Sequence, residues 1–231
     1  MTIPSDDRLA DPLPREPLET AAAWLAEAWR RHAQPNPDAM TLATSTADGR
    51  PSARIVLCKD IVPQPGYVVF YTNYHSRKGG ELADNPRAAA VLHFDALGWQ
   101  VRVEGLVEPS PPAESDAYFA SRALQSRVGA WASAQSEPIE SRARLRAAVA
   151  ETARRFGLDP HAADAAPDAA AEVQIPRPPH WGGYRLWAQA VELWVQGAGR
   201  IHDRARWTRT LTRLEDGRMQ AGAWSVTRLQ P

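Results

Sequence analysis

Three polar side chains recur at helical spacing between Tyr118 and Ser136. Tyr118, Arg122 and Ser126 are four residues apart, so an unbroken helix would carry all three on one face. A phenol, a guanidinium and a hydroxyl supply hydrogen-bond donors and one fixed positive charge, which suits a phosphate monoester. The spacing alone also fits an ordinary solvated helix face, so both interpretations stay open here.

Two other segments place cations where an anion could bind. In residues 71–78 (YTNYHSRK), hydroxyls precede Arg77 and Lys78 at the expected start of a short helix, where backbone N–H groups and the helix dipole favour an anion. An ordinary helix cap with exposed charges is the alternative. Arg54 and Lys59 lie on a predicted strand at an odd separation, so they need not converge and could be two solvated charges.

A last cluster follows Trp194. Arg200, His202 and Arg204 would share one face of a strand. Two cations beside a histidine are costly unless an anion or a ring lies nearby. The charged outer face of an edge strand would give the same pattern.

We expect strands to position most of these residues. Short apolar segments joined by turn signals such as Asp48-Gly49 indicate a closed or nearly closed antiparallel barrel with peripheral helices. The predicted strands are 39–46, 51–59, 67–72, 88–94, 100–108, 183–186, 190–195, 201–207, 207–214 and 224–229. The predicted helices are 18–32, 76–82, 113–121, 126–134 and 141–156. We expect a flexible arm at 1–17, one domain at 18–231 and a mobile Ala-rich loop at 158–176.

Composition restricts the class of protein. The 231 residues carry 27 basic and 27 acidic side chains, a balance that argues against nucleic acid or an anionic membrane as the main partner. No apolar run approaches the ~20 residues of a membrane-spanning helix. The single cysteine, Cys58, rules out an internal disulfide and fits a reducing cytoplasm. We predict no metal site.

Several of these segments together resemble the pyridoxamine 5'-phosphate oxidase family. The segments are RIVLCK at 54–59, YTNYHSRK at 71–78, WQVRVEG at 99–105, YFASR at 118–122 with QSRVGAWASAQS at 125–136, and RIHDR at 200–204. The chain departs from the family pattern at Cys58 (usually Leu), Trp99 (usually Arg) and Ala123-Leu124 (usually Pro-Arg). It also lacks the Arg-x-x-Tyr segment that many members carry at the N-terminus.

The resemblance implies a homodimeric split β-barrel that binds FMN, with dimerisation-type strands at 183–231. It implies that FMN is bound by Arg54, Tyr71, Thr72, Arg77, Lys78, Gln100, Gln135, Ser136, Trp194 and Arg204. It implies that the substrate phosphate is bound by Lys59, Tyr118, Arg122 and Ser126, and that Arg200 and His202 are catalytic residues that orient the substrate.

The implied activity is oxidation of pyridoxine or pyridoxamine 5'-phosphate to pyridoxal 5'-phosphate. FMN would take a hydride from the substrate, and dioxygen would then yield hydrogen peroxide. Two alternatives remain open: a related oxidase of another substrate, such as a phenazine precursor, and a non-enzymatic binder of FMN or pyridoxal phosphate.

Overall fold

The computed structural model describes residues 8–159 and 173–231, which form two compact units. The sheet unit comprises Met1–Phe70, Asp84–Glu108 and Tyr184–Pro231. The helical unit comprises Tyr71–Ala83 and Pro109–Gly183.

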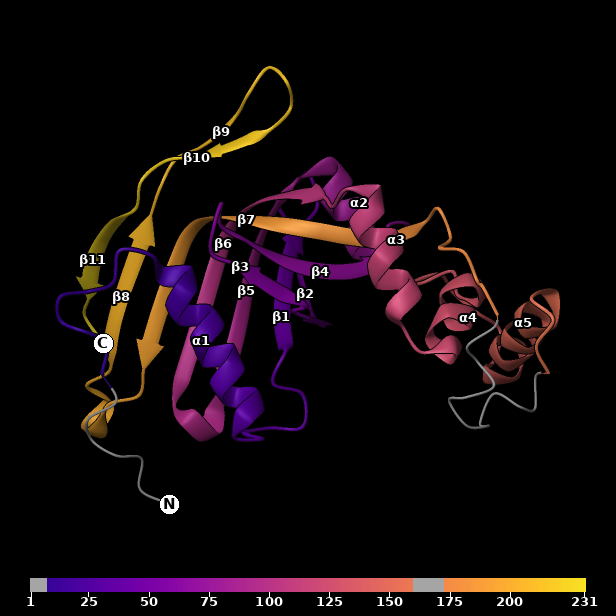
Figure 1. Cartoon of the computed structure of the whole chain (residues 1–231), viewed down its shortest axis with the longest axis horizontal. Coiled ribbons are helices and arrows are strands. Elements are labelled where there is room, and N and C mark those ends of the chain that lie inside the picture. Colours follow the sequence, from indigo (N-terminus) through magenta and orange to yellow (C-terminus); the bar gives the residue numbers. More distant parts are fainter. Residues whose placement is uncertain (1–7, 160–172) are drawn as a thin grey trace. The chain divides into compact units, whose positions relative to one another are not determined.

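A nine-stranded sheet dominates the sheet unit, and Figure 1 shows that it curls. Seven strands follow the order β11-β8-β7-β6-β5-β1-β2, while β4 pairs with β3 and β7. The bounds are β1 (Ala39–Ser45), β2 (Pro51–Leu57), β3 (Asp60–Val62), β4 (Tyr67–Asn73), β5 (Arg87–Phe94), β6 (Trp99–Pro109), β7 (Trp181–Val195), β8 (Asp203–Thr208) and β11 (Ser225–Leu229). A separate hairpin pairs β9 (Leu211–Arg213) with β10 (Met219–Ala221).

Strict alternation along β6 separates a core face from a polar face. Val101, Val103 and Val107 are buried, whereas Gln100 and Arg102 on the other face are partly exposed. Helix α1 (Pro17–Arg30) lies across the sheet (Figure 1), and its Trp24 stacks on Trp99 with ring centroids 4.9 Å apart. Trp99, where the family usually has Arg, therefore serves as a core residue that holds α1 on β6.

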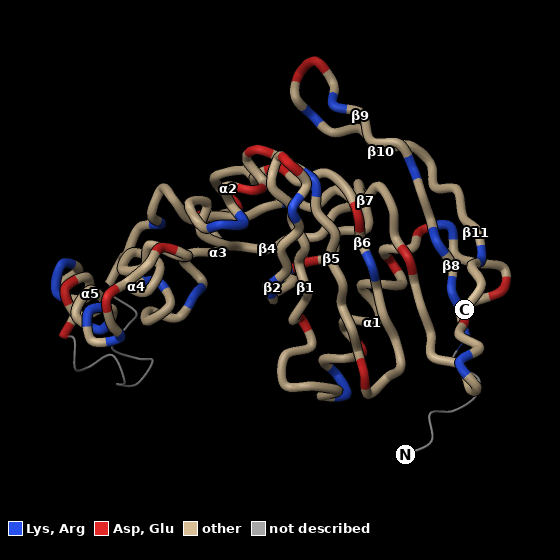
Figure 2. Tube along the Cα trace, turned by 180° about the vertical axis from the view of Figure 1, so that it is seen from behind, with Lys and Arg blue, Asp and Glu red and all other residues tan. Residues whose placement is uncertain are grey.

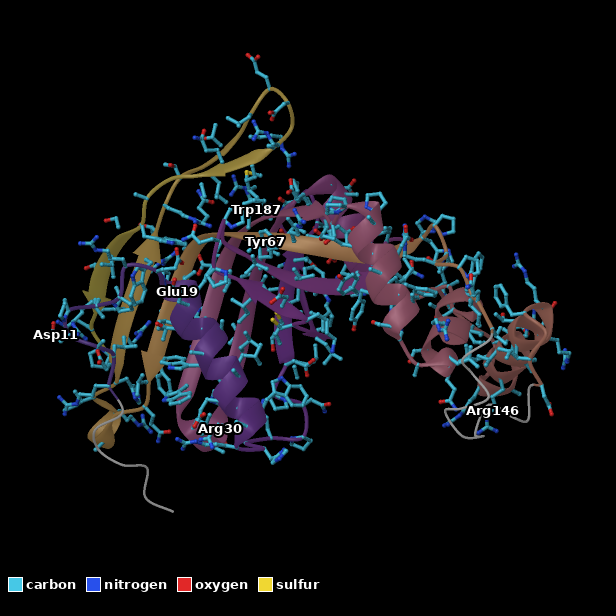
Figure 3. The ribbon with its side chains drawn as sticks, viewed as in Figure 1. Asp11, Glu19, Arg30, Tyr67, Arg146 and Trp187 are labelled. Atoms are coloured by element: carbon cyan, nitrogen blue, oxygen red, sulfur yellow. The ribbon has the colours of Figure 1, made fainter. Side chains whose placement is uncertain are left out.

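The sequence predicted two strands where the structure has one. β7 runs without interruption for 15 residues and is buried along most of its length, so it lacks the alternation that marks a half-exposed strand. Trp187 fills the expected gap and packs against Tyr67 of β4 at 5.0 Å between ring centroids (Figure 3). Gly105 of β6 lets β7 approach closely, because a Cβ there would lie 1.8 Å from the Trp187 carbonyl oxygen.

Four helices shape the helical unit: α2 (Arg77–Asp84), α3 (Pro112–Ser121), α4 (Leu124–Ala132) and α5 (Arg142–Arg155). Their core is a cluster of five buried residues, Phe119, Val128, Ala153, Ile175 and Trp181. Among the described residues, no helix is both long and apolar enough to cross a membrane. The expectation of a mainly β protein with peripheral helices is confirmed.

A break separates the two helices predicted at 113–121 and 126–134, so Tyr118, Arg122 and Ser126 do not share one face of an unbroken helix. α3 ends at Ser121, and Arg122 takes an extended conformation (φ −75°, ψ 150°) before α4 begins. No proline or glycine marks this break. Leu124 packs against the core of the helical unit, and this tertiary contact occurs at the break between α3 and α4.

Part of the expected flexible arm packs on the sheet unit. The backbone N–H of Leu9 donates to Asp203 Oδ2 at 2.9 Å, and Trp207 Nε1 donates to the Pro14 carbonyl oxygen at 2.9 Å. Leu9 and Pro14 thus make specific contacts with the sheet unit, and the flexible arm at 1–17 stays a prediction. Residues 1–7 of the arm and 160–172 of the Ala-rich loop lie outside the described residues.

We predict that Gly105→Ala destabilises the protein by about 3 kcal/mol, because the methyl group would collide with the backbone of β7. Gly129→Ala in α4 is the matched control, since a Cβ at Gly129 meets nothing within 4 Å. Alanine there should leave stability unchanged or raise it by up to about 1 kcal/mol. Urea denaturation of both variants is the measurement. Equal midpoints would contradict the close approach of β6 and β7.

Candidate functional site

Lys78 is a buried cation held by neutral oxygens in the helical unit. Its Nζ donates to Thr72 Oγ1 at 2.9 Å, Ser76 Oγ at 2.9 Å and Gln135 Oε1 at 2.7 Å. The residue is 8% exposed. Burying an ammonium is costly unless hydrogen bonds or an anion compensate, so this cluster suits a phosphate at its edge.

Some of the neighbouring residues join the hydrogen-bond cluster around Lys78, and others lie apart from it. Thr72 also donates to Gln135 Oε1 at 3.3 Å, so the two segments 71–78 and 133–136 meet around Lys78. Arg77 lies at the start of α2, where its exposed side chain pairs with the buried Glu81 at 2.9 Å. Ser136 is exposed and has a positive φ of 76°. The structure therefore brings Thr72, Lys78 and Gln135 together, with Arg77 turned towards Glu81.

Aromatic rings form a second cluster in the helical unit. Tyr71 stacks on Tyr118 with centroids 3.9 Å apart and on Trp181 at 5.5 Å. The Arg122 guanidinium carbon lies 4.5 Å from the Trp181 ring centroid, a cation–π distance. Ser126 is exposed in the first turn of α4. Trp181 is central to this cluster.

Arg122 has an unused donor. Its Nη1 atom is buried and makes no hydrogen bond within the described residues. Burial lowers the pKa of the guanidinium, yet an arginine side chain stays charged at neutral pH. A buried, unsatisfied cationic donor is costly, and an anion that accepts from it would remove that cost. The donor thus fits the phosphate group suggested for Arg122.

In the sheet unit, strands position Arg54 and Lys59 separately. Arg54 Nη1 donates to the Leu42 carbonyl oxygen at 2.9 Å and to Thr44 Oγ1 at 2.6 Å, so its guanidinium lies against β1. Lys59 follows β2 and pairs with Asp38 at 2.7 Å. Between them, Cys58 is buried, and burial followed by the charges of Asp38 and Asp60 raises its pKa to about 12. Cys58 is therefore a packing residue in place of the family's leucine.

Charged side chains pair across β6, β7 and β8, and Figure 2 marks the charged positions on these neighbouring strands. The carboxylate of Glu192, which is 5% exposed, accepts from Arg204 Nη2 at 2.8 Å and from Arg102 Nη1 at 3.1 Å. Trp194 is directly opposite Arg204 in the strand register. Gln100 shares this face through the alternation of β6. Gln100, Trp194 and Arg204 thus lie on one face, with Glu192 as an anchor that sequence reasoning missed.

Arg200 and His202 do not lie on a strand as expected. Arg200 ends a 3₁₀ helix, η4 (Ala198–Arg200), with a left-handed φ of 64°, and β8 begins at Asp203. Gly197 and Gly199 permit this tight turn, which the interpretation of 200–204 as a strand ignored. His202 Nδ1 accepts from the Gly197 N–H at 3.2 Å, and its ring lies 4.6 Å from that of Trp194.

Comparison with known families matches most of the chain. The model described as "Pyridoxamine 5'-phosphate oxidase" matches residues 26–155. The model described as "Pyridoxine 5'-phosphate oxidase C-terminal dimerisation region" matches residues 181–231.

Curated relatives carry the same family name. A pyridoxine/pyridoxamine 5'-phosphate oxidase of Maricaulis maris is 46% identical over 217 residues, which cover 94% of this chain and 86% of the relative. One from Burkholderia mallei is 49% identical over 197 residues, which cover 85% of this chain and 81% of the relative.

Solved structures agree on the fold. PhzG from Burkholderia lata, in complex with tetrahydrophenazine-1-carboxylic acid, matches with a TM-score of 0.80 and 32% identity, covering 98% of this chain and 100% of PhzG. An FMN-binding protein of Nostoc punctiforme, related to pyridoxamine 5'-phosphate oxidase, matches with a TM-score of 0.64 and 17% identity over 93% of this chain and 98% of its own. The predicted split β-barrel is confirmed, and the chain belongs to the pyridoxamine 5'-phosphate oxidase family.

Proposed function

We propose that this protein is an FMN-dependent oxidase that converts pyridoxine or pyridoxamine 5'-phosphate to pyridoxal 5'-phosphate, with dioxygen as acceptor and hydrogen peroxide as product. The observation that carries the proposal is Arg122, whose buried Nη1 is unsatisfied within the described residues and fits a phosphate monoester. The names of the curated relatives support the same substrate.

The proposed FMN ligands are the residues that the family resemblance implies. They are Arg54, Tyr71, Thr72, Arg77, Lys78, Gln100, Gln135, Ser136, Trp194 and Arg204. The buried ammonium of Lys78, surrounded by hydroxyl and amide oxygens, fits the phosphate end of this cofactor. When bound, FMN would supply the redox chemistry by accepting a hydride and passing electrons to dioxygen.

The remaining residues are proposed to bind and orient the substrate. Lys59, Tyr118, Arg122 and Ser126 would hold its phosphate, and Arg200 and His202 would contact the ring and its reacting substituent. Because His202 Nδ1 accepts the Gly197 N–H, the neutral imidazole carries its proton on Nε2. His202 is therefore set to donate a hydrogen bond from Nε2 to an alcohol oxygen of the substrate.

A phenazine-type oxidase is the second candidate. It is favoured by the structural match to PhzG at a TM-score of 0.80. The higher identity to oxidases of B6 vitamers favours the first candidate. A non-enzymatic binder is the third, and the presence of both Arg200 and His202 argues against it.

We also propose a homodimer in the cytoplasm. The matched dimerisation region at 181–231 supports the dimer. The single cysteine, buried in the sheet unit, is consistent with a reducing compartment.

The proposed reaction predicts that pyridoxine 5'-phosphate bleaches the oxidised flavin spectrum of the FMN-loaded protein under anaerobic conditions. Admission of air should restore the spectrum and release peroxide. A flavin that stays oxidised with this substrate, but is bleached by a dihydrophenazine precursor, would support the second candidate instead. Flavin that neither compound reduces would favour the binder.

For Arg122→Ala we predict a rise in KM for the phosphorylated substrate of about 100-fold, because a charge-assisted contact to phosphate is lost. Arg122→Lys should be intermediate, since a lysine keeps the charge but loses the planar guanidinium. Arg146→Ala is the control, because Arg146 is an exposed arginine of α5 (Figure 3). An unchanged KM in Arg122→Ala would refute the phosphate contact.

The two lysines of the sequence, Lys59 and Lys78, allow a matched test of the cofactor site. Lys78→Met should weaken FMN binding at least about tenfold, because a cation near the cofactor phosphate is removed. Lys59→Met should leave FMN affinity within about twofold and instead weaken substrate binding. Fluorescence titration of the apoprotein with FMN measures both. Equal effects of the two substitutions on FMN affinity would contradict the assignment.

A further inference from the structure

The Asp38–Lys59 ion pair is built into the β1–β2 ladder. Asp38 directly precedes β1, and its carbonyl oxygen accepts the Cys58 N–H at 2.7 Å, extending the pairing of Ala39 with Leu57. The Lys59 N–H donates to the Val69 carbonyl oxygen at 2.8 Å. Both backbones are therefore fixed, and Asp38 Oδ2 lies 2.7 Å from Lys59 Nζ.

The two partners differ in exposure. The Asp38 side chain is 8% exposed, whereas that of Lys59 is 28% exposed. Asp38 is thus the more deeply buried partner, and part of the Lys59 side chain is exposed to solvent. A lysine ammonium has three hydrogens, so a group arriving from solvent can accept one while Asp38 keeps another.

We propose that Asp38 is a positioning residue that also weakens the hold of Lys59 on the phosphate of the substrate. This inference rests on the proposed function, in which Lys59 is a phosphate ligand. Asp38 fixes the ammonium in one place and cancels most of its charge. The phosphate therefore meets an oriented hydrogen-bond donor with little net attraction.

Two opposing effects decide how the affinity for the phosphate changes when the Asp38 charge is removed. Pre-ordering a flexible side chain is worth up to about tenfold in affinity. A phosphate that accepts a hydrogen bond from Lys59 would place its charge about 6 Å from the Asp38 carboxylate. At an effective permittivity of about 20, the repulsion between two unit charges at this distance lowers the affinity by roughly a hundredfold. Solvent at Lys59 screens part of this repulsion, yet repulsion remains the larger effect.

The strength of the hold on the phosphate affects substrate and product alike. The proposed reaction changes the substituent on the pyridine ring and leaves the phosphate intact. A tighter hold on the phosphate would stabilise substrate, transition state and product equally, which lowers KM without raising kcat. By weakening this hold, Asp38 would speed the release of the phosphorylated product.

The test compares Asp38→Asn with the wild type, both loaded with FMN. Asparagine has nearly the same shape but no charge. We expect the dissociation constant of pyridoxal 5'-phosphate to fall about tenfold, that of unphosphorylated pyridoxal to stay within twofold, and KM and kcat for the phosphorylated substrate to fall together. Asp38→Glu should restore the wild-type values. These changes separate a charge effect from a merely structural one, which would weaken binding of both ligands.

Asp60→Asn is the matched control, because Asp60 is an exposed carboxylate next to Lys59 and its removal changes the net charge equally. It should change the affinity for pyridoxal 5'-phosphate less than twofold. A second measurement uses acetylation of amines followed by mass spectrometry, with Lys78 as internal reference. In Asp38→Asn, Lys59 should react severalfold faster relative to Lys78, because the charge-assisted hydrogen bond that holds its Nζ to the Asp38 carboxylate is lost.

The outcomes separate this proposal from the proposed function. Wild-type protein that binds pyridoxal 5'-phosphate without oxidising its precursor would overturn the function, while tighter binding by Asp38→Asn would still uphold the role of Asp38. Normal oxidation with unchanged or weaker binding by Asp38→Asn would overturn the role of Asp38 alone. Wild-type protein that binds no phosphate ester would overturn both.

Discussion

The cost of removing cations from water governs the candidate site. A buried ammonium or guanidinium is stable where oxygens or an anion replace the lost water. Lys78 has three such oxygens, from Thr72, Ser76 and Gln135. Arg122 lies over the face of Trp181 and retains a buried donor that no described residue satisfies. The helical unit thus holds one cation whose hydrogen bonds are met and another whose full satisfaction requires a ligand.

In the sheet unit, carboxylates compensate for the cost of removing cations from water. Glu192, nearly buried, binds Arg102 and Arg204 from strands on either side of β7, and Asp38 binds Lys59. Removing one partner of such a pair leaves an uncompensated charge, so these carboxylates fix the positions of the cations. Cations in this unit are consequently well placed but partly neutralised. Arg122, whose donor is unsatisfied, is the stronger electrostatic attraction for an anion.

Sequence patterns predicted the strands and the residue types of the candidate site, but not the residues that pair with the cations of that site. Short apolar segments identified β1 and β6, and the turn signal Asp48-Gly49 identified the hairpin of β1 and β2, because these are local properties. Asp38 and Glu192 carry no local signal, since their importance comes from residues 21 and 12 positions away. The helices predicted at 113–121 and 126–134 leave Arg122 outside both, but the start of α4 at Leu124 was not predicted, because Leu124 is turned inward by tertiary packing.

The turn before β8 shows how glycine makes a strained placement possible. A Cβ at Gly197 would lie 1.7 Å from the Ile201 carbonyl oxygen, so only glycine allows the chain to fold back there. The same glycine donates its N–H to His202 Nδ1, which fixes both the ring and its tautomer. Arg200, between them, adopts a left-handed φ of 64° that costs free energy for a side chain other than glycine. This turn places Arg200 and His202 before the start of β8, so Arg200, His202 and Arg204 do not lie along one strand.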